Sequence, residues 1–303
     1  MQHFKDHFKN YIASDCYVTP KKLFRAFFSK RSMFLFAWFV FAIYSMNICN
    51  AYVYSRMPIE SPLPDILADS WKNYAYLRKS KTYMSRQPAD SLSVVLTASC
   101  ILVAIFRWDI INVPKLAFTY NICLHLRVLF FSVTGLPPAC IGYPNCPCAV
   151  VPYATISRLY SVPKIAFIYS FALGLFLGSV PQCGDLTMSG HTIYLWVLAL
   201  FLTDALDKIF TGRILILIKL IIYVLLLFVT LTIILIRNHY TIDILLATIF
   251  TNMLWTLYGW MANLSNFNHH DFTKTYAGKF IGYLEKRMED PDDDATFSSA
   301  SDI

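Results

Sequence analysis

Two short polar clusters, each directly ahead of an apolar stretch, hold the residues best suited to chemistry. The first is CGDLTMSGHT at residues 183–192, and the second is HYTID at residues 239–243. Asp243 follows His239 by four residues, so the two side chains share one face if a helix begins near His239. A carboxylate at that place accepts one imidazole proton and leaves the other ring nitrogen as a nucleophile or base.

The two clusters are predicted to lie on the same side of a membrane. One apolar crossing, a basic connection at residues 208–213 and a second crossing separate them. Two crossings return the chain to its starting face, where His191 can donate and then accept a proton. A pair of histidines, one oriented by a carboxylate, suits metal-free phosphoryl transfer through a phosphohistidine. The alternative is that each is an ordinary interfacial histidine, but Asp243 and the Ser189-Gly190-His191 turn favour the chemical interpretation.

The composition places these clusters in a membrane protein. Apolar residues make up 56% of the chain and charged residues 15%, against about 45–50% and about 25% in soluble domains. The net charge of +7 comes from basic residues that flank apolar blocks, which indicates membrane topology and anionic lipid rather than nucleic acid. The sequence has no CxxC pair and no group of carboxylates that would form a metal cage, so we expect neither metal nor cofactor.

An all-α, polytopic bundle of six transmembrane helices is the predicted fold, because a span needs roughly 20 apolar residues. A further block at 165–180 is short and holds two glycines, so it is interpreted as a re-entrant or buried segment and not counted. The domains expected are a cytosolic tail at 1–32, a catalytic membrane domain at 33–262 and a solvated, flexible cytosolic tail at 263–303. The six predicted spans are residues 33–54, 92–106, 116–136, 192–206, 214–236 and 242–261.

The orientation follows from the basic residues. They precede the first span and fill the short connections, and the even number of spans puts both termini in the cytosol. The first 31 residues are mixed and charged, unlike a secretory signal, so the first apolar block is expected to remain as an anchor. Basic residues between 55 and 91 favour the opposite assignment for that loop, and the span count is given more weight.

Several further residues are candidates for the site. Arg127 lies inside an apolar block, where an arginine is costly, and is either a phosphate clamp or the structural partner of Asp109 or Asp185. Asp185 either orients a histidine or caps the helix that begins near Ser189. Four cysteines of one connecting region could form luminal disulfides, and three pairings stay open. These cysteines are Cys140, Cys146, Cys148 and Cys183.

The two clusters resemble two signature motifs of the sphingomyelin synthase family, within the wider lipid phosphatase superfamily. Two more segments agree with this resemblance. PLPD at residues 62–65, followed by Asp69, resembles the family's first-loop motif, and Arg127 followed by LP at residues 136–137 resembles its third-span motif. The four motifs occur in the family's order and span residues 62–243.

The resemblance implies transfer of phosphocholine from phosphatidylcholine to ceramide, with release of diacylglycerol. His239 would attack the phosphorus, Asp243 would orient it, and His191 would protonate the leaving oxygen and then deprotonate ceramide. The expected location is the Golgi or plasma membrane, with the active site on the luminal or extracellular face. The partners are these lipids and no nucleic acid, and a homo-oligomer is left open. The candidate substrate-binding residues are Arg127, Asp185, Ser189 and Asn238.

The residue before the second histidine departs from the family's pattern. Choline users have Glu there and ethanolamine users have Asp, whereas this chain has Asn238 preceded by Arg237. Phosphatidylethanolamine as donor, or an inositol product, is therefore an alternative. A lipid phosphate phosphatase would use the same histidines, although no KxxxxxxRP-type clamp precedes them. A membrane scaffold with degenerate motifs is the remaining alternative, and the intact histidines and Asp243 argue against it.

Overall fold

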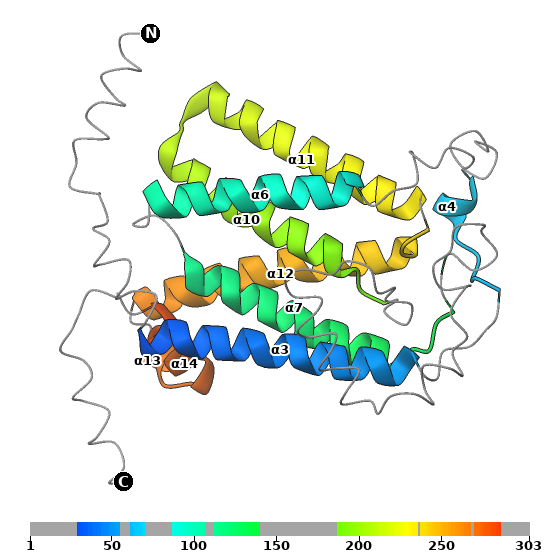
Figure 1. Ribbon diagram of the computed structural model, residues 1–303. Helices are drawn as coiled ribbons and strands as arrows, with labels where there is room; N and C mark the ends of the chain where they lie inside the picture. Colours follow the sequence, from blue (N-terminus) through cyan, green and yellow to red (C-terminus); the bar gives the residue numbers. More distant parts are fainter. Residues whose placement is uncertain are drawn as a thin grey trace.

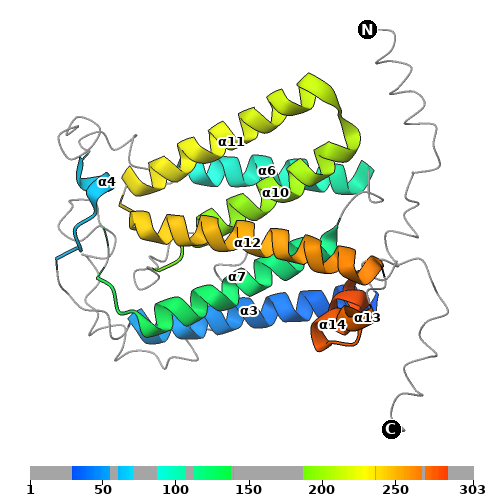
Figure 2. The same cartoon turned by 180° about the vertical axis from the view of Figure 1, so that it is seen from behind.

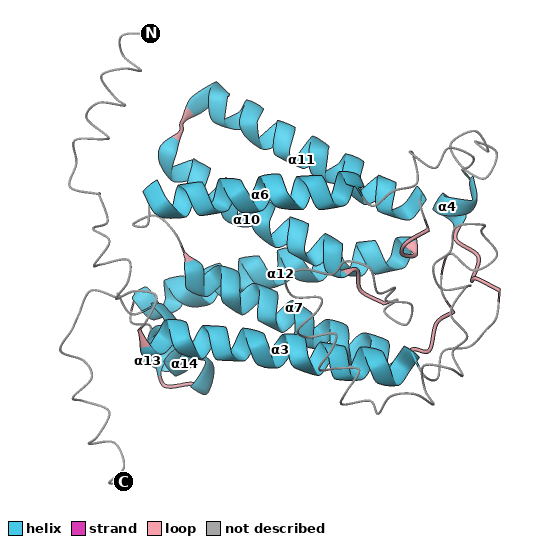
Figure 3. Ribbon diagram, viewed as in Figure 1, coloured by secondary structure: helices cyan, strands magenta, loops and turns pink. Residues whose placement is uncertain are grey.

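Six long helices lie side by side in the computed structural model (Figures 1 and 2). The structure describes residues 29–54, 61–70, 87–106, 112–137, 139, 187–235, 237–267 and 270–285. No strand occurs in these ranges (Figure 3), which confirms the all-α prediction there. The long helices are α3 (Lys30–Tyr54), α6 (Gln87–Phe106), α7 (Val113–Val133), α10 (Gly190–Ile209), α11 (Gly212–Leu235) and α12 (Thr241–Asn266). The short helices are α4 (Ile66–Ser70), α13 (His270–Thr273) and α14 (Tyr276–Glu285).

Four of the long helices are long and apolar enough to cross a membrane: α3, α7, α11 and α12. At 1.5 Å per residue their spans of 20 to 26 residues match a hydrocarbon core of about 30 Å. In α6 the apolar part is shorter, Ser91–Val103. Helix α10 carries His191, Asp204 and Asp207, which lower its mean hydropathy. Direct support therefore covers four of the six predicted spans, and the crossing of α6 and α10 stays a prediction.

Helices α10 and α11 differ in their surroundings. Helix α10 contacts α6, α7, α11 and α12, and most of its residues are buried. Helix α11 instead exposes large apolar side chains along much of its length, including Ile216, Leu220 and Phe228. An apolar outer surface of this kind fits contact with lipid chains. The protein thus keeps α10, which carries a histidine and two aspartates, inside the bundle, and presents the strongly apolar α11 outside.

The hairpin formed by α10 and α11 brings the starts of α10 and α12 to one end of the bundle. A turn at Phe210 and Thr211 ends at Gly212, whose φ of 71° suits glycine. The chain then returns along α11 and enters α12 at Thr241. We call the end that holds His191 and His239 the histidine end, where α4 also lies (right in Figure 1), and the end with α13 and α14 the opposite end.

The described part of the predicted C-terminal tail, residues 263–267 and 270–285, differs from a flexible segment. Helix α12 continues to Asn266, and α14 packs against it. Ile281 and Leu284 are buried in a cluster with Tyr258 of α12 and Leu35 of α3. The prediction of a solvated segment is therefore wrong for residues 270–285, because apolar side chains spaced three or four apart give that stretch a face to bury. The segment 165–180 and the four cysteines of the connecting region lie outside the described residues.

Candidate active site

The first turn of α12 is built around Asp243. Its Oδ2 accepts a hydrogen bond of 3.0 Å from the backbone N–H of Tyr240. The N–H of Asp243 donates in turn to the carbonyl of Tyr240 over 3.1 Å. A carboxylate at the third helical position that reaches back to the residue before the helix satisfies one of the free N–H groups of the helix start. Asp243 is therefore fixed by the backbone, and its side chain is fully buried.

His239 points at this carboxylate, as the spacing of four residues predicts. Its Nδ1 lies 3.3 Å from Oδ2 of Asp243, and its side chain is 6% exposed. Because a carboxylate only accepts, the imidazole donates from Nδ1 and keeps the lone pair of Nε2. The other oxygen of Asp243, Oδ1, is buried without a hydrogen-bond partner among the described residues. The pair therefore holds His239 in the tautomer that a nucleophile requires.

The start of α10 lies directly beside the start of α12. Ser189 caps α10 by accepting a hydrogen bond from the N–H of Thr192. Its own N–H donates to the carbonyl of Asp243 over 3.2 Å. His191 is two residues further along and half-buried, so the structure brings both histidines to one end, as predicted. The hydroxyl of Ser189 is fully buried as a helix cap, and its role in substrate binding stays a prediction.

Arg127 of α7 reaches the same place. Its Nη1 donates to Sδ of Met46 over 3.2 Å, and a Cβ added to Gly190 would lie only 2.2 Å from that Nη1. Glycine is therefore required for the guanidinium to lie against the N-terminus of α10. The charge of Asp243 also acts on Arg127. The two acids considered as structural partners, Asp109 and Asp185, lie outside the described residues.

Asp65 ties the first-loop segment to the start of α12. Its carboxylate accepts hydrogen bonds of 2.7 Å from both the N–H and the hydroxyl of Thr241, and one of 3.1 Å from the N–H of Ala68. Burial by itself raises the pKa of Asp65, but the bonds from Thr241 and Ala68 and the charge of Arg237 together bring the pKa below its usual value. The ionised carboxylate is thus the form that this contact uses.

Asp69 and Arg237 make a second connection between the same two segments. The guanidinium of Arg237 forms an ion pair with the Asp69 carboxylate, and Arg237 is only 5% exposed. Its φ of 55° is unusual for a residue with a side chain. The positive charge beside the half-buried Asn238 is therefore matched by an acid of the first loop.

Tyr240 joins three of the four motifs through its hydroxyl group. This group accepts from the N–H of Leu63 over 3.1 Å and donates to the carbonyl of Pro137 over 2.9 Å. Burial raises the pKa of Tyr240, so the hydroxyl keeps the proton that it donates to Pro137. The hydroxyls of Thr134 and Thr187 also lie 2.5 Å apart. The four motifs, far apart in the sequence, thus meet at the histidine end.

The sequence reasoning missed three residues of this arrangement: Thr241, Tyr240 and the role of Arg237 as a partner of Asp69. The opposite charges of Asp69 and Arg237 were the signal that could have predicted this ion pair. Within the part of the chain that the structure describes, no three His, Cys, Asp or Glu side chains gather as a metal site. This geometry suits nucleophilic attack by the oriented imidazole of His239, with His191 and Arg127 at the same end of the bundle.

Two comparisons with known proteins agree with the motifs of this site. Residues 182–260, which hold both histidine clusters, match the C-terminal part of the PAP2 superfamily. The chain is also 25% identical over 178 residues to the phosphatidylcholine:ceramide cholinephosphotransferase 1 of Caenorhabditis elegans. That alignment covers 57% of this chain and 35% of the relative, so the chain matches about a third of the relative's length. The two matches confirm the resemblance that the motifs indicate, to the sphingomyelin synthases and the wider lipid phosphatase superfamily.

Proposed function

We propose that the chain transfers a phospho-head group from a glycerophospholipid to ceramide, with phosphatidylcholine as the donor. The observation that carries the proposal is the contact between the oriented His239–Asp243 pair and the start of α10, through the bond from Ser189 to Asp243. This contact supports a site at the histidine end in which His239 is the nucleophile and His191 is a separate acid–base group. The relative from Caenorhabditis elegans has the corresponding name.

The reaction runs in two balanced steps. In the first, Nε2 of His239 forms a bond to the phosphorus while the bond from phosphorus to the glycerol oxygen breaks. His191 gives its proton to that oxygen, so diacylglycerol leaves and a phosphohistidine remains. In the second, His191 takes the proton of ceramide's primary hydroxyl, and that oxygen attacks the phosphorus. The bond to His239 breaks, and both histidines return to their first state.

The phosphate group would be held between Arg127 and the start of α10. A helix N-terminus favours negative charge because its first N–H groups lack partners inside the helix. Arg127 adds a planar fork of donors that suits phosphate oxygens, and Gly190 leaves room for it. Both groups would stabilise the charge that develops on the phosphoryl oxygens during each transfer.

The head group is the part of the substrate that the site specifies least. Arg237 is paired with Asp69. The negative charge of Asp69 therefore offsets the positive charge beside Asn238, which would otherwise repel a choline cation. Asn238 nevertheless offers an amide in place of a carboxylate, and an amide also suits the hydroxyls of inositol. Phosphatidylethanolamine and phosphatidylinositol are therefore the second candidates as donors.

We further propose that the histidine end faces the lumen or the exterior, in the Golgi or the plasma membrane. The opposite end carries Lys115, Lys208 and Arg213 near the helix ends, and basic residues mark the cytosolic side. Epitope tags at both termini of the full chain test this orientation. If antibody binds the terminal tags on intact cells, without permeabilisation, the termini are outside and this orientation is contradicted.

A membrane assay with labelled ceramide and a panel of three donors tests the reaction. Phosphatidylcholine, phosphatidylethanolamine and phosphatidylinositol are offered separately, each labelled in the head group. We expect label in sphingomyelin from the first donor and none from a His239→Ala enzyme. Label released as a free phospho-head group, with none in ceramide products, would instead show hydrolysis by water, and release of phosphate from labelled phosphatidic acid would identify a lipid phosphate phosphatase. Transfer from phosphatidylinositol alone would correct the donor and leave the reaction class in place.

A further inference from the structure

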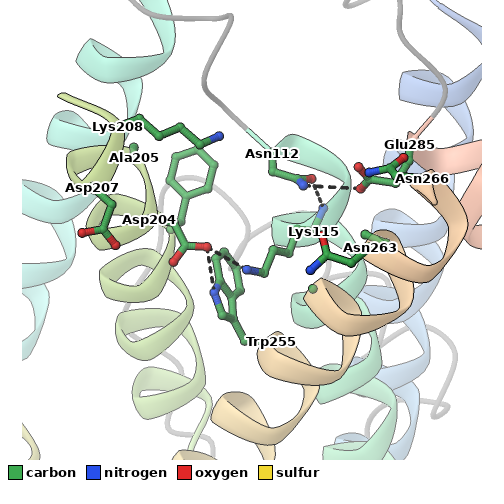
Figure 4. A pocket seen from close by; sticks show the side chains of 13 residues that line it. Asn112, Lys115, Asp204, Ala205, Asp207, Lys208, Trp255, Asn263, Asn266 and Glu285 are labelled. Atoms are coloured by element: carbon green, nitrogen blue, oxygen red, sulfur yellow. Dashed lines mark hydrogen bonds and ion pairs between the residues drawn. The ribbon is translucent and has the colours of Figure 1, made fainter.

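A cavity of about 330 Å³ lies at the opposite end of the bundle, between the start of α7 and the ends of α10, α12 and α14 (Figure 4). Its volume is within the range of small-ligand pockets, about 300–1,000 Å³. Lys208, on its rim, follows His191 by 17 residues of α10, a distance of about 25 Å along the helix. The cavity is therefore separate from the proposed active site.

The inner wall of the cavity is a closed set of polar contacts. The ammonium of Lys115 lies 2.7 Å from Oδ2 of Asp204 and 4.3 Å from the ring centre of Trp255. The indole N–H of Trp255 donates to the same carboxylate oxygen over 3.1 Å. The Lys115 side chain is 14% exposed and the Asp204 side chain 46%, so the lysine is largely enclosed while the carboxylate stays accessible. The wall is thus polar, preformed and neutral in net charge.

Three further charged residues line the cavity, and two of them, Lys208 and Glu285, lie on opposite sides of it (Figure 4). The third, Asp207, lies on the same side as Lys208 and forms an ion pair with Lys219 of α11. Lys208 belongs to α10, and Glu285 is the last residue of α14. Oε1 of Glu285 accepts hydrogen bonds from the hydroxyl of Tyr258 over 2.6 Å and from the amide of Asn112 over 3.3 Å. These donors are neutral, so they fix the position of the Glu285 carboxylate without cancelling its charge. The cavity therefore has a positive side and a negative side.

The aromatic residues of this end indicate its level in the membrane. Trp260 is 59% exposed and Phe267 is 85% exposed. Exposed tryptophan is typical of the boundary between hydrocarbon and head groups. Asn263 and Asn266, which line the cavity, lie between these two residues in the sequence. The cavity is thus open at the depth where phospholipid head groups lie.

We propose that this cavity binds the zwitterionic head group of a phospholipid from the leaflet at the opposite end, with the phosphate toward Lys208 and the ammonium toward Glu285. The charge separation matches a head group that carries both signs and disfavours one that carries only a negative charge. The site is a second lipid site, independent of the transfer reaction proposed above. No bond is made or broken there.

Photolabelling of the full chain in detergent micelles tests the site. The probe is phosphatidylethanolamine with a photoactivatable diazirine next to the glycerol, and labelled peptides are mapped by mass spectrometry. We expect label at residues 199–209 and 255–267 that excess unlabelled phosphatidylethanolamine or phosphatidylcholine removes and phosphatidylglycerol does not. Glu285→Gln keeps an acceptor for Tyr258 and removes the charge, so the apparent affinity should fall about tenfold. Lys208→Gln should give a similar loss on the phosphate side.

Two exposed charged residues at the same end provide matched controls. Asp271→Asn and Lys279→Gln remove one charge each from exposed positions and should leave labelling unchanged. Label that phosphatidylglycerol removes equally well would overturn the proposal, as would unchanged labelling in both Glu285→Gln and Lys208→Gln. Equal competition by free phosphoethanolamine would overturn the lipid as the source of the head group. Label confined to residues 187–193 and 239–245 would assign the probe to the histidine end alone.

Discussion

The two ends of the bundle hold their polar groups in different ways. At the histidine end, backbone groups fix the side chains: Asp243 is tied to the N–H of Tyr240, and Asp65 to the N–H groups of Thr241 and Ala68. At the opposite end, side chains fix one another, as in the Lys115–Asp204 pair. Backbone donors have fixed positions, whereas long side chains can rearrange. The histidine end is thus suited to chemistry with strict geometry, and the opposite end to a ligand that is only held.

The largest expected effect comes from His239→Ala. Without the nucleophile, both head-group release and transfer should fall by at least about 10⁴-fold. Labelled-ceramide turnover in membranes measures the loss, and trapping of phosphorylated enzyme locates the label. His270→Ala removes an exposed histidine at the opposite end and should leave the rate unchanged. Phosphate trapped on His191 would overturn the assignment of the two roles, and full activity in His239→Ala would show that His239 is not required.

Asp243→Asn should cost nearly as much in rate and little in folding. The N–H of Tyr240 and Nδ1 of His239 share one oxygen of Asp243, Oδ2. An amide that turns its NH₂ group to this place selects the wrong tautomer of His239, which costs about 10⁴-fold in comparable triads. It also loses the bond from Tyr240, for which we expect a loss of stability of only about 1 kcal/mol. Turnover and thermal unfolding are measured side by side. The control Asp271→Asn should change neither, and wild-type turnover in Asp243→Asn would show that orientation is unimportant.

Gly190→Ala should have a smaller but specific effect. Alanine is the better helix former, so α10 should not weaken. The added Cβ would, however, displace the guanidinium of Arg127, and the loss of one positioned donor costs about 10²–10³-fold in rate. Gly135→Ala is the matched control, because a Cβ there meets nothing within 4 Å. Equal turnover in the two variants would remove Arg127 from the proposed phosphate site.

The Arg237–Asp69 ion pair should contribute less. We expect Arg237→Ala and Asp69→Ala each to lower stability by about 1–2 kcal/mol and the double variant to lose less than the sum. A thermodynamic cycle from unfolding midpoints measures the coupling. Arg213→Ala, at an exposed position of α11, serves as the control. Strict additivity of the two single losses would show that the loop is not held by this pair.

The smallest effect concerns pH and Asp65. Its pKa is lower in the folded protein than in the unfolded chain, so the ionised form stabilises the fold. This contribution is complete above the ordinary aspartate pKa of about 3.9 and is lost as the pH falls through the lowered folded value. The difference in unfolding temperature between wild type and Asp65→Asn should therefore be constant from about pH 5 to 7. A difference that already shrinks near pH 6 would contradict the assignment.

Local patterns in the sequence predicted most of the helices and the central pair of the site. Apolar blocks located the long helices, and the spacing of four residues placed His239 against Asp243. Contacts between distant segments were not predictable, because periodicity carries no information on which helices become neighbours. The pairs Asp65–Thr241, Asp69–Arg237 and Arg127–Gly190 are of this kind. Helix α14 was not predicted, because its apolar face is short and an acidic stretch of sequence follows it.

The double use of Asp243 has a consequence for the newly made chain. The same oxygen that aims His239 also closes the first turn of α12, so the imidazole cannot be aimed before that turn exists. A ribosome-bound or half-inserted chain is surrounded by phospholipid long before its helices are assembled. Its His239 would then be an ordinary histidine, without a fixed tautomer. Reactivity toward the membrane would begin only once this turn has formed.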